Sequence, residues 1–214
     1  MIMRSILLFF VTYLSILNVY GQIQIFRTGD NGNIITSPEY IEPFINGTHS
    51  DIEPYILKET SVINTDVGYT IRCLRYNGWE NETGDFNVIE INTGQGEVLN
   101  LQYDEGWERV SMPGLQYGNK SFYHETLVNG EVALFFTGAT LMSQPPYLTI
   151  IILAHGRACL VFNKRMIVNN VVRENGDLLF NLQENVIEWT DEYTPADDAV
   201  LHTISIKNGL MYFE

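Results

Sequence analysis

Side chains able to perform acid–base or metal chemistry are spread widely along this chain. The four histidines are His49, His124, His155 and His202. They are far apart, and none has a second histidine or a cysteine at the spacing of a metal site. Acidic residues gather in three turn-like segments, and none matches the oxygen spacing and turning glycine of a calcium loop. Nucleophile-elbow and phosphate-loop motifs are also absent from the sequence. We therefore expect no metal, no cofactor and no catalytic residue, and we predict a protein that is not an enzyme.

Two tryptophans are better candidates for contact with a ligand. Trp79 and Trp107 each follow a glycine and precede a glutamate, at expected junctions between strands and loops. An indole ring in that place suits stacking on a sugar or holding an amphipathic ligand. The neighbouring carboxylates would add attraction for an ammonium group. Packing in the core or rim of a β domain is the alternative role for both residues.

The start of the chain has the order of regions found in a secretory signal. Residues 1–4 give a short basic start through Arg4, residues 6–17 are strongly apolar, and Gly21 ends the segment with a small residue. The apolar run is shorter than the roughly 20 residues that a membrane span needs. We predict that residues 1–21 are a signal peptide and that residues 22–214 form one secreted, extracellular domain without a membrane span. An uncleaved anchor is the alternative.

Secretion through an oxidising compartment would allow the two cysteines to form a disulfide and the asparagine sequons to be glycosylated. Cys73 and Cys159 are the only cysteines, so a single intramolecular pairing exists, and we predict a disulfide between them. A buried free thiol is the alternative. Asn46, Asn81 and Asn119 each begin an Asn-x-Ser/Thr sequon in polar, turn-like surroundings. Together with the leader, these sequons predict a glycoprotein.

The charge of the chain narrows the classes of partner. The formal net charge is −14 at pH 7, which repels phosphate-rich molecules and argues against nucleic acid as a partner. A cationic partner would be attracted, although acidity more often serves solubility.

Short apolar runs separated by Gly, Asn and Asp predict the elements that hold these residues. The runs are rich in β-branched and aromatic residues and recur every 8–15 residues, which is typical of an antiparallel β domain. The expected strands are Tyr55–Ile63, Gly68–Tyr76, Phe86–Asn92, Glu97–Tyr103, Trp107–Met112, Val132–Thr137, Tyr147–Ala154, Ala158–Lys164, Met166–Val172 and Asp177–Leu182. Glycine-containing turns at residues 93–96, 155–157 and 174–177 predict three hairpins. Thr194 followed by Pro195 predicts one short helix, to Leu201, and residues 204–206 and 209–213 are expected to form a last strand after it.

Part of the chain resembles the lipocalins of arthropods. Residues 55–60 and 68–73 look like the first two strands of that family, the second of which carries a disulfide cysteine. Residues 147–151 and 159–161 are similar to its late hairpin, and residues 195–210 are similar to the helix that follows the barrel. The resemblance implies an eight-stranded up-and-down barrel that binds a small apolar or amine ligand inside. The family's early Gly-x-Trp is missing here, and the strand-like sequence after Lys164 exceeds what a barrel needs.

Two fold and function hypotheses follow. The first is a secreted, all-β single domain, an up-and-down barrel that binds a small hydrophobic or cationic ligand without chemistry. The second is a two-sheet β-sandwich, of jelly-roll or immunoglobulin-like type, acting as an extracellular module for carbohydrate or a protein partner through Trp79 and Trp107. A hydrolase built on dispersed carboxylates is a third class, because such a pair leaves no spacing signature.

Overall fold

The computed structural model describes residues 21–44, 56–76, 84–110, 112–115, 119–140, 145–184 and 200–214. Several sequence predictions lie outside these ranges: residues 1–20 of the expected signal, Trp79, Asn46, Asn81, and residues 194–199 of the expected helix. The last two residues of that helix belong instead to a strand that begins at Val200.

The described residues form an all-β structure with antiparallel sheets, as predicted, and they contain no α-helix. The strands are β1 (Ile23–Gln24), β2 (Phe26–Thr28), β3 (Ile34–Thr36), β4 (Ile56–Ile63), β5 (Tyr69–Arg75), β6 (Phe86–Thr93), β7 (Gly96–Glu108), β8 (Tyr123–Thr126), β9 (Val132–Gly138), β10 (Tyr147–Ala154), β11 (Arg157–Arg165), β12 (Ile167–Glu174), β13 (Asp177–Glu184), β14 (Val200–Lys207) and β15 (Leu210–Phe213). Two short 3-10 turns, η1 (Pro38–Tyr40) and η2 (Val128–Gly130), complete the elements. The three predicted hairpins, β6–β7, β10–β11 and β12–β13, are all present.

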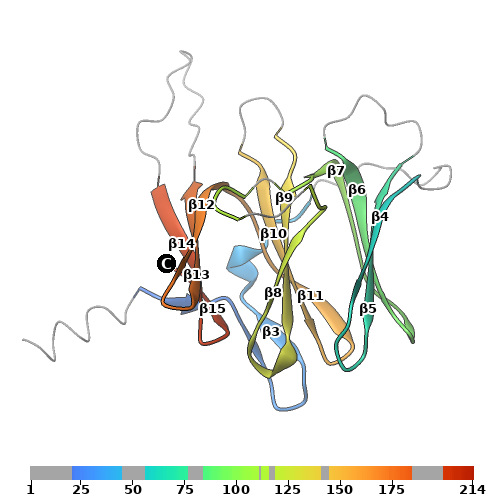
Figure 1. Cartoon of the computed structure of the whole chain (residues 1–214), viewed down its shortest axis with the longest axis horizontal. Helices are drawn as coiled ribbons and strands as arrows, with labels where there is room; N and C mark the ends of the chain where they lie inside the picture. The colour runs from blue at the N-terminus through green and yellow to red at the C-terminus, as the bar shows by residue number, and fades with distance from the viewer. Residues whose placement is uncertain are drawn as a thin grey trace, which may run out of the picture.

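One sheet has eight strands in the order β11-β10-β9-β7-β6-β5-β4, with β8 also paired to β9. Its two halves diverge because β7 and β9 pair through two residue pairs, Trp107 with Gly138 and Glu108 with Thr137. Figure 1 shows the β4–β7 half standing apart from the half that contains β8–β11. The sheet therefore bends and encloses side chains between its halves.

A second sheet has five strands in the order β1-β15-β14-β13-β12, and β2 and β3 form a two-stranded ribbon. This second sheet contains most of the sequence after Arg165 that exceeded the needs of a barrel. In Figure 1 it lies beside the β8–β11 half, so the molecule has three layers of strands.

The expected closed barrel is not formed. Among the described residues, β4 and β11 end the eight-stranded order and do not pair with each other. The physical reason lies at the edge of β11, where Ile41 forms a parallel bridge to Asn163. The amide of Glu42 donates to the carbonyl of Asn163 at 2.9 Å, so this part of the edge is already occupied.

Two hydrophobic clusters fill the spaces between the layers. The first lies between the five-stranded sheet and the β8–β11 half, where the rings of Phe135 and Phe180 stack at 4.6 Å. The second lies inside the bend of the eight-stranded sheet and includes Trp107 and Ile151. All eight residues of β10 are buried, since its two faces serve different clusters. Leu148–Leu153 is an apolar run on both faces of the strand, a pattern that predicts an enclosed position in the sheet, and its burial confirms this.

Strand β7 differs from its prediction. The sequence pattern indicated two strands with a break near Gly106, but Gly96–Glu108 is one element. Gly106 has φ +76°, and a Cβ there would lie 2.5 Å from the carbonyl oxygen of Phe86. The pairing register with β6 shifts at Phe86–Val88, so the glycine marks a bulge within the strand and not its end.

Candidate functional site

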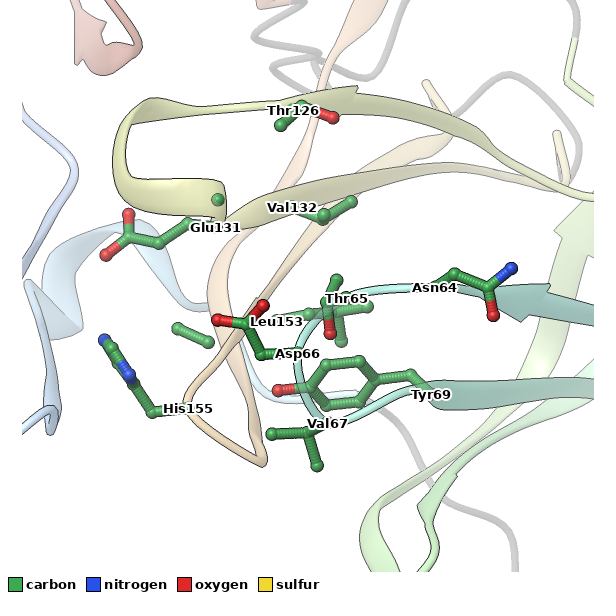
Figure 2. A pocket seen from close by; sticks show the side chains of 12 residues that line it. Asn64, Thr65, Asp66, Val67, Tyr69, Thr126, Glu131, Val132, Leu153 and His155 are labelled. Atoms are coloured by element: carbon green, nitrogen blue, oxygen red, sulfur yellow. The ribbon is translucent and has the colours of Figure 1, made fainter.

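A pocket of about 250 Å³ lies at one end of the molecule, where several turns meet. The β4–β5 turn, the η2 connection before β9 and the β10–β11 turn form its walls, as Figure 2 shows. The lining residues are Asn64, Thr65, Asp66, Val67, Tyr69, Thr126, Gly130, Glu131, Val132, Leu153, Ala154 and His155. Two carboxylates and one imidazole are present, and none of these twelve residues is a lysine or an arginine.

The floor of the pocket is apolar and firmly held. Tyr69, Val132 and Leu153 are buried and belong to the cluster inside the bent sheet. The Tyr69 hydroxyl accepts the backbone N–H of Gly156 at 2.8 Å, which ties β5 to the β10–β11 turn. Burial raises the pKa of Tyr69, so the phenol is neutral at physiological pH. The pocket thus opens above the end of a packed core.

Glu131 is the most unusual group in the pocket. Its exposed fraction is 8 %, and the hydroxyl of Thr28 donates a hydrogen bond to its Oε1. Within the described part of the chain, no Lys, Arg or His side chain forms an ion pair with it. Backbone hydrogen bonds fix its position, because Glu131 accepts from Leu127 at 2.7 Å and donates to Val128 at 3.4 Å. Removing a carboxylate from water without a cation is costly, so this position favours a positively charged partner.

Asp66 and His155 come from turns on either side of the pocket. Both side chains are exposed, and both line the pocket together with Glu131 (Figure 2). His155 has φ +51°, and a Cβ added to Gly32 would lie 3.3 Å from its imidazole, so the ring lies close to the β2–β3 turn. No group of three or more His, Cys, Asp or Glu residues in the described ranges is arranged to hold a metal ion.

Trp107, one of the two predicted ligand contacts, is fully buried inside the bent sheet. Its ring packs near Phe86 and Phe44, at centroid distances of 5.9 and 5.4 Å. Its indole Nε1–H donates to Thr149 Oγ1 at 3.1 Å. These contacts are those of a core residue, which was the alternative role. Trp107 does not line the pocket.

The predicted Cys73–Cys159 disulfide is absent, because both cysteines are free thiols. Cys73 lies on β5 inside the bent sheet, whereas Cys159 lies on β11 and packs against the cluster between the sheets. Strands β6, β7, β9 and β10 separate β5 from β11 in the sheet order. Side chains on different strands and different cores cannot meet the short Cβ–Cβ distance of a disulfide. Burial raises the pKa of Cys73 to about 12, so its thiol is inert.

Asn119 is the one predicted glycosylation site within the described ranges. It is exposed and has a left-handed backbone, with φ +29°. Two residues later, Ser121 is buried, and both its N–H and its hydroxyl donate to Glu59, at 3.1 and 2.6 Å. The asparagine side chain is therefore at the surface while the rest of the sequon anchors the loop to β4.

Sequence reasoning missed the pocket because its polar residues come from three separate turns. His155 is one of four dispersed histidines and lies in a predicted turn, and Asp66 and Glu131 are single acids among 26. Only the fold brings them to one place. Among the described residues, no helix is long and apolar enough to cross a membrane. Comparisons with protein-family models, with curated proteins and with solved structures gave no match.

Proposed function

We propose that this protein is a secreted, non-enzymatic binding protein that takes a small amphipathic amine into the pocket between the β4–β5 and β10–β11 turns. The observation that carries the proposal is Glu131, a buried carboxylate on the pocket wall without a cationic partner among the described residues. An ammonium group of a ligand would supply the missing charge, and Asp66 at the rim would add to the attraction.

The shape and the charge of the pocket support this class of ligand over others. Tyr69, Val132 and Leu153 offer a narrow apolar floor for one ring or a short alkyl chain. A volume of about 250 Å³ suits a small molecule, not a lipid. The chain's net charge of −14 disfavours anions. A large apolar ligand inside the bent sheet is disfavoured, because aromatic side chains fill that space.

The packing of two sheets around a shared layer supports a sandwich-type arrangement for the fold. Leu178, Phe180 and Leu182 alternate along β13 and face the cluster between the sheets. Secretion rests on the leader and the sequons of the sequence.

Calorimetric titration with 2-phenylethylamine tests the proposal, in a buffer without amines. Neutral 2-phenylethanol and anionic 3-phenylpropanoate serve as matched ligands of similar shape. We expect the amine to bind and the other two to bind weakly or not at all. A charge-assisted hydrogen bond contributes about 1.5–3 kcal/mol, so Glu131→Gln should weaken amine binding roughly 10- to 150-fold.

Glu108→Gln is the matched control variant. Glu108 is exposed and pairs with Thr137, which lies near the opposite end of β9 from the pocket residue Val132. The substitution removes the same charge without touching the pocket, and amine affinity should stay close to that of the original protein. Equal binding of the amine and the alcohol, or unchanged amine binding in Glu131→Gln, would show that the carboxylate is not the recognition element.

A further inference from the structure

A second cavity, also of about 250 Å³, lies close to the first. Its walls are the end of β8, the β12–β13 turn and the β14–β15 turn of the five-stranded sheet. Thr126, the last residue of β8, is exposed and lines both cavities. The two cavities therefore adjoin the same strand end, one toward the bent sheet and the other toward the five-stranded sheet.

The partition between the cavities is short and well held. The backbone N–H of Val128 in η2 donates to the carbonyl of Gly209 at 3.3 Å, which joins the β14–β15 turn to the connection before β9. Glu131, on the wall of the first cavity, follows η2 directly. Because exposed Thr126 lines both cavities, an extended ligand that leaves the first cavity over this residue would reach the second.

The second cavity also holds an acid without a cationic partner. Its single cation, Arg173, is paired with Glu125 at 2.7 Å, and the guanidinium also donates to the hydroxyl of Tyr123 at 3.2 Å. Asp177 lines the cavity as well, and no cation of the described residues pairs with it. The Arg173–Glu125 pair is neutral overall, so Asp177 leaves the second cavity with a net negative charge.

We propose that the ligand spans both cavities and carries two ammonium groups separated by a flexible chain, one held at Glu131 and the other at Asp177. This inference rests on the proposed function, because the first ammonium group occupies the pocket described above. The exposed side of Thr126 is where the chain of the ligand would cross. Linking two weak charge contacts in one molecule raises the effective concentration of the second group, so the gain in affinity should depend on chain length.

The test is a calorimetric series of α,ω-diaminoalkanes from four to twelve carbons, each compared with the monoamine of equal length. We expect diamines at or above one chain length to bind about tenfold or more tightly than their monoamines, as for two linked sites. Asp177→Asn should abolish this difference and leave monoamine affinity unchanged. Glu174→Gln is the matched control, because Glu174 is exposed on the same turn and does not line the cavity.

The outcomes separate the two proposals. If monoamines bind and no diamine binds more tightly, or if Asp177→Asn retains the diamine advantage, the two-cavity inference is wrong while the amine pocket stands. If neither monoamines nor diamines bind, both proposals fail. An equal loss of the diamine advantage in Glu174→Gln would indicate general electrostatic attraction and would also overturn the assignment of Asp177.

Discussion

Replacing Thr149 by valine tests the polar contact at the centre of the bent sheet. Thr149 is fully buried on β10, and its hydroxyl accepts from Trp107 Nε1 at 3.1 Å and donates to Asn163 Oδ1 at 2.8 Å. Asn163, also fully buried, donates from Nδ2 to the carbonyl of Glu42 at 2.7 Å. This chain of hydrogen bonds links β7, β10, β11 and the segment that covers the edge of β11.

The size of the effect follows from the two groups that the substitution leaves without a partner. Valine has nearly the same shape as threonine, so no cavity forms, but a buried indole N–H and a buried amide oxygen lose their partner. Each such loss costs about 1–3 kcal/mol, and the more apolar valine side chain offsets part of it, so we expect a net loss of about 2–4 kcal/mol. For a domain of this size, that corresponds to a fall in Tm of roughly 5–15 °C.

Urea unfolding followed by far-UV circular dichroism measures this loss as a lower midpoint with an unchanged m-value. Thr149→Ser is the control, since it keeps the hydroxyl and removes one methyl group, at a cost of about 1 kcal/mol. If Thr149→Val is as stable as Thr149→Ser or more stable, the hydrogen bonds of Trp107 and Asn163 do not contribute as the contacts imply.

Three further predictions concern a glycine that packs against β12, the loss of stability at acidic pH and the reactivity of the two thiols. Gly114→Ala should lower Tm strongly, because Gly114 has φ +93° and its Cβ would lie 2.1 Å from a β12 carbonyl oxygen; Gly94→Ala, in open space, should not. Burial alone would raise the pKa of Glu59, but hydrogen bonds from a neighbouring loop outweigh this effect and hold that pKa below its ordinary value of 4.5. The ionised Glu59 should therefore contribute fully to the free energy of unfolding above pH 4.5, and this contribution should disappear as the pH falls through the pKa of Glu59 in the folded protein. Glu59→Gln should make the stability depend less on pH over this acidic range, as unfolding curves at several pH values would show. Iodoacetamide should label half-buried Cys159 in the folded protein well before fully buried Cys73, as peptide mass analysis would show; equal rates would contradict their burial.

Local pattern predicted most of the strands correctly. The expected strands Tyr147–Ala154 and Asp177–Leu182 both appear, because burial of one or both faces of a strand selects the residue types along it. Strands β1, β2, β3 and β8 were missed, since each has only two to four residues and no measurable period.

The choice between a barrel and two packed sheets depends on contacts that carry no periodic signal. The bridge from Ile41 to Asn163, which occupies the edge of β11, joins two isolated residues far apart in the chain. The disulfide was argued from the count of cysteines and the compartment, and neither says that Cys73 and Cys159 face different cores. The pocket acids could not be predicted either, because the pairing of the sheets, and not the spacing in the sequence, determines which turns lie close together.

Burial of β10 on both faces makes the folding of the two sheets a single event. Ile150 and Ile152 face one core while Ile151 and Leu153 face the other, so loss of either layer exposes alternate residues of the same strand. A fragment that ends before β12 would expose Phe135 and its apolar neighbours to water on one face of the sheet. Such a fragment should aggregate and not fold as a smaller domain. Proteolysis at the turns should accordingly give either intact protein or small peptides, without a long-lived half-molecule.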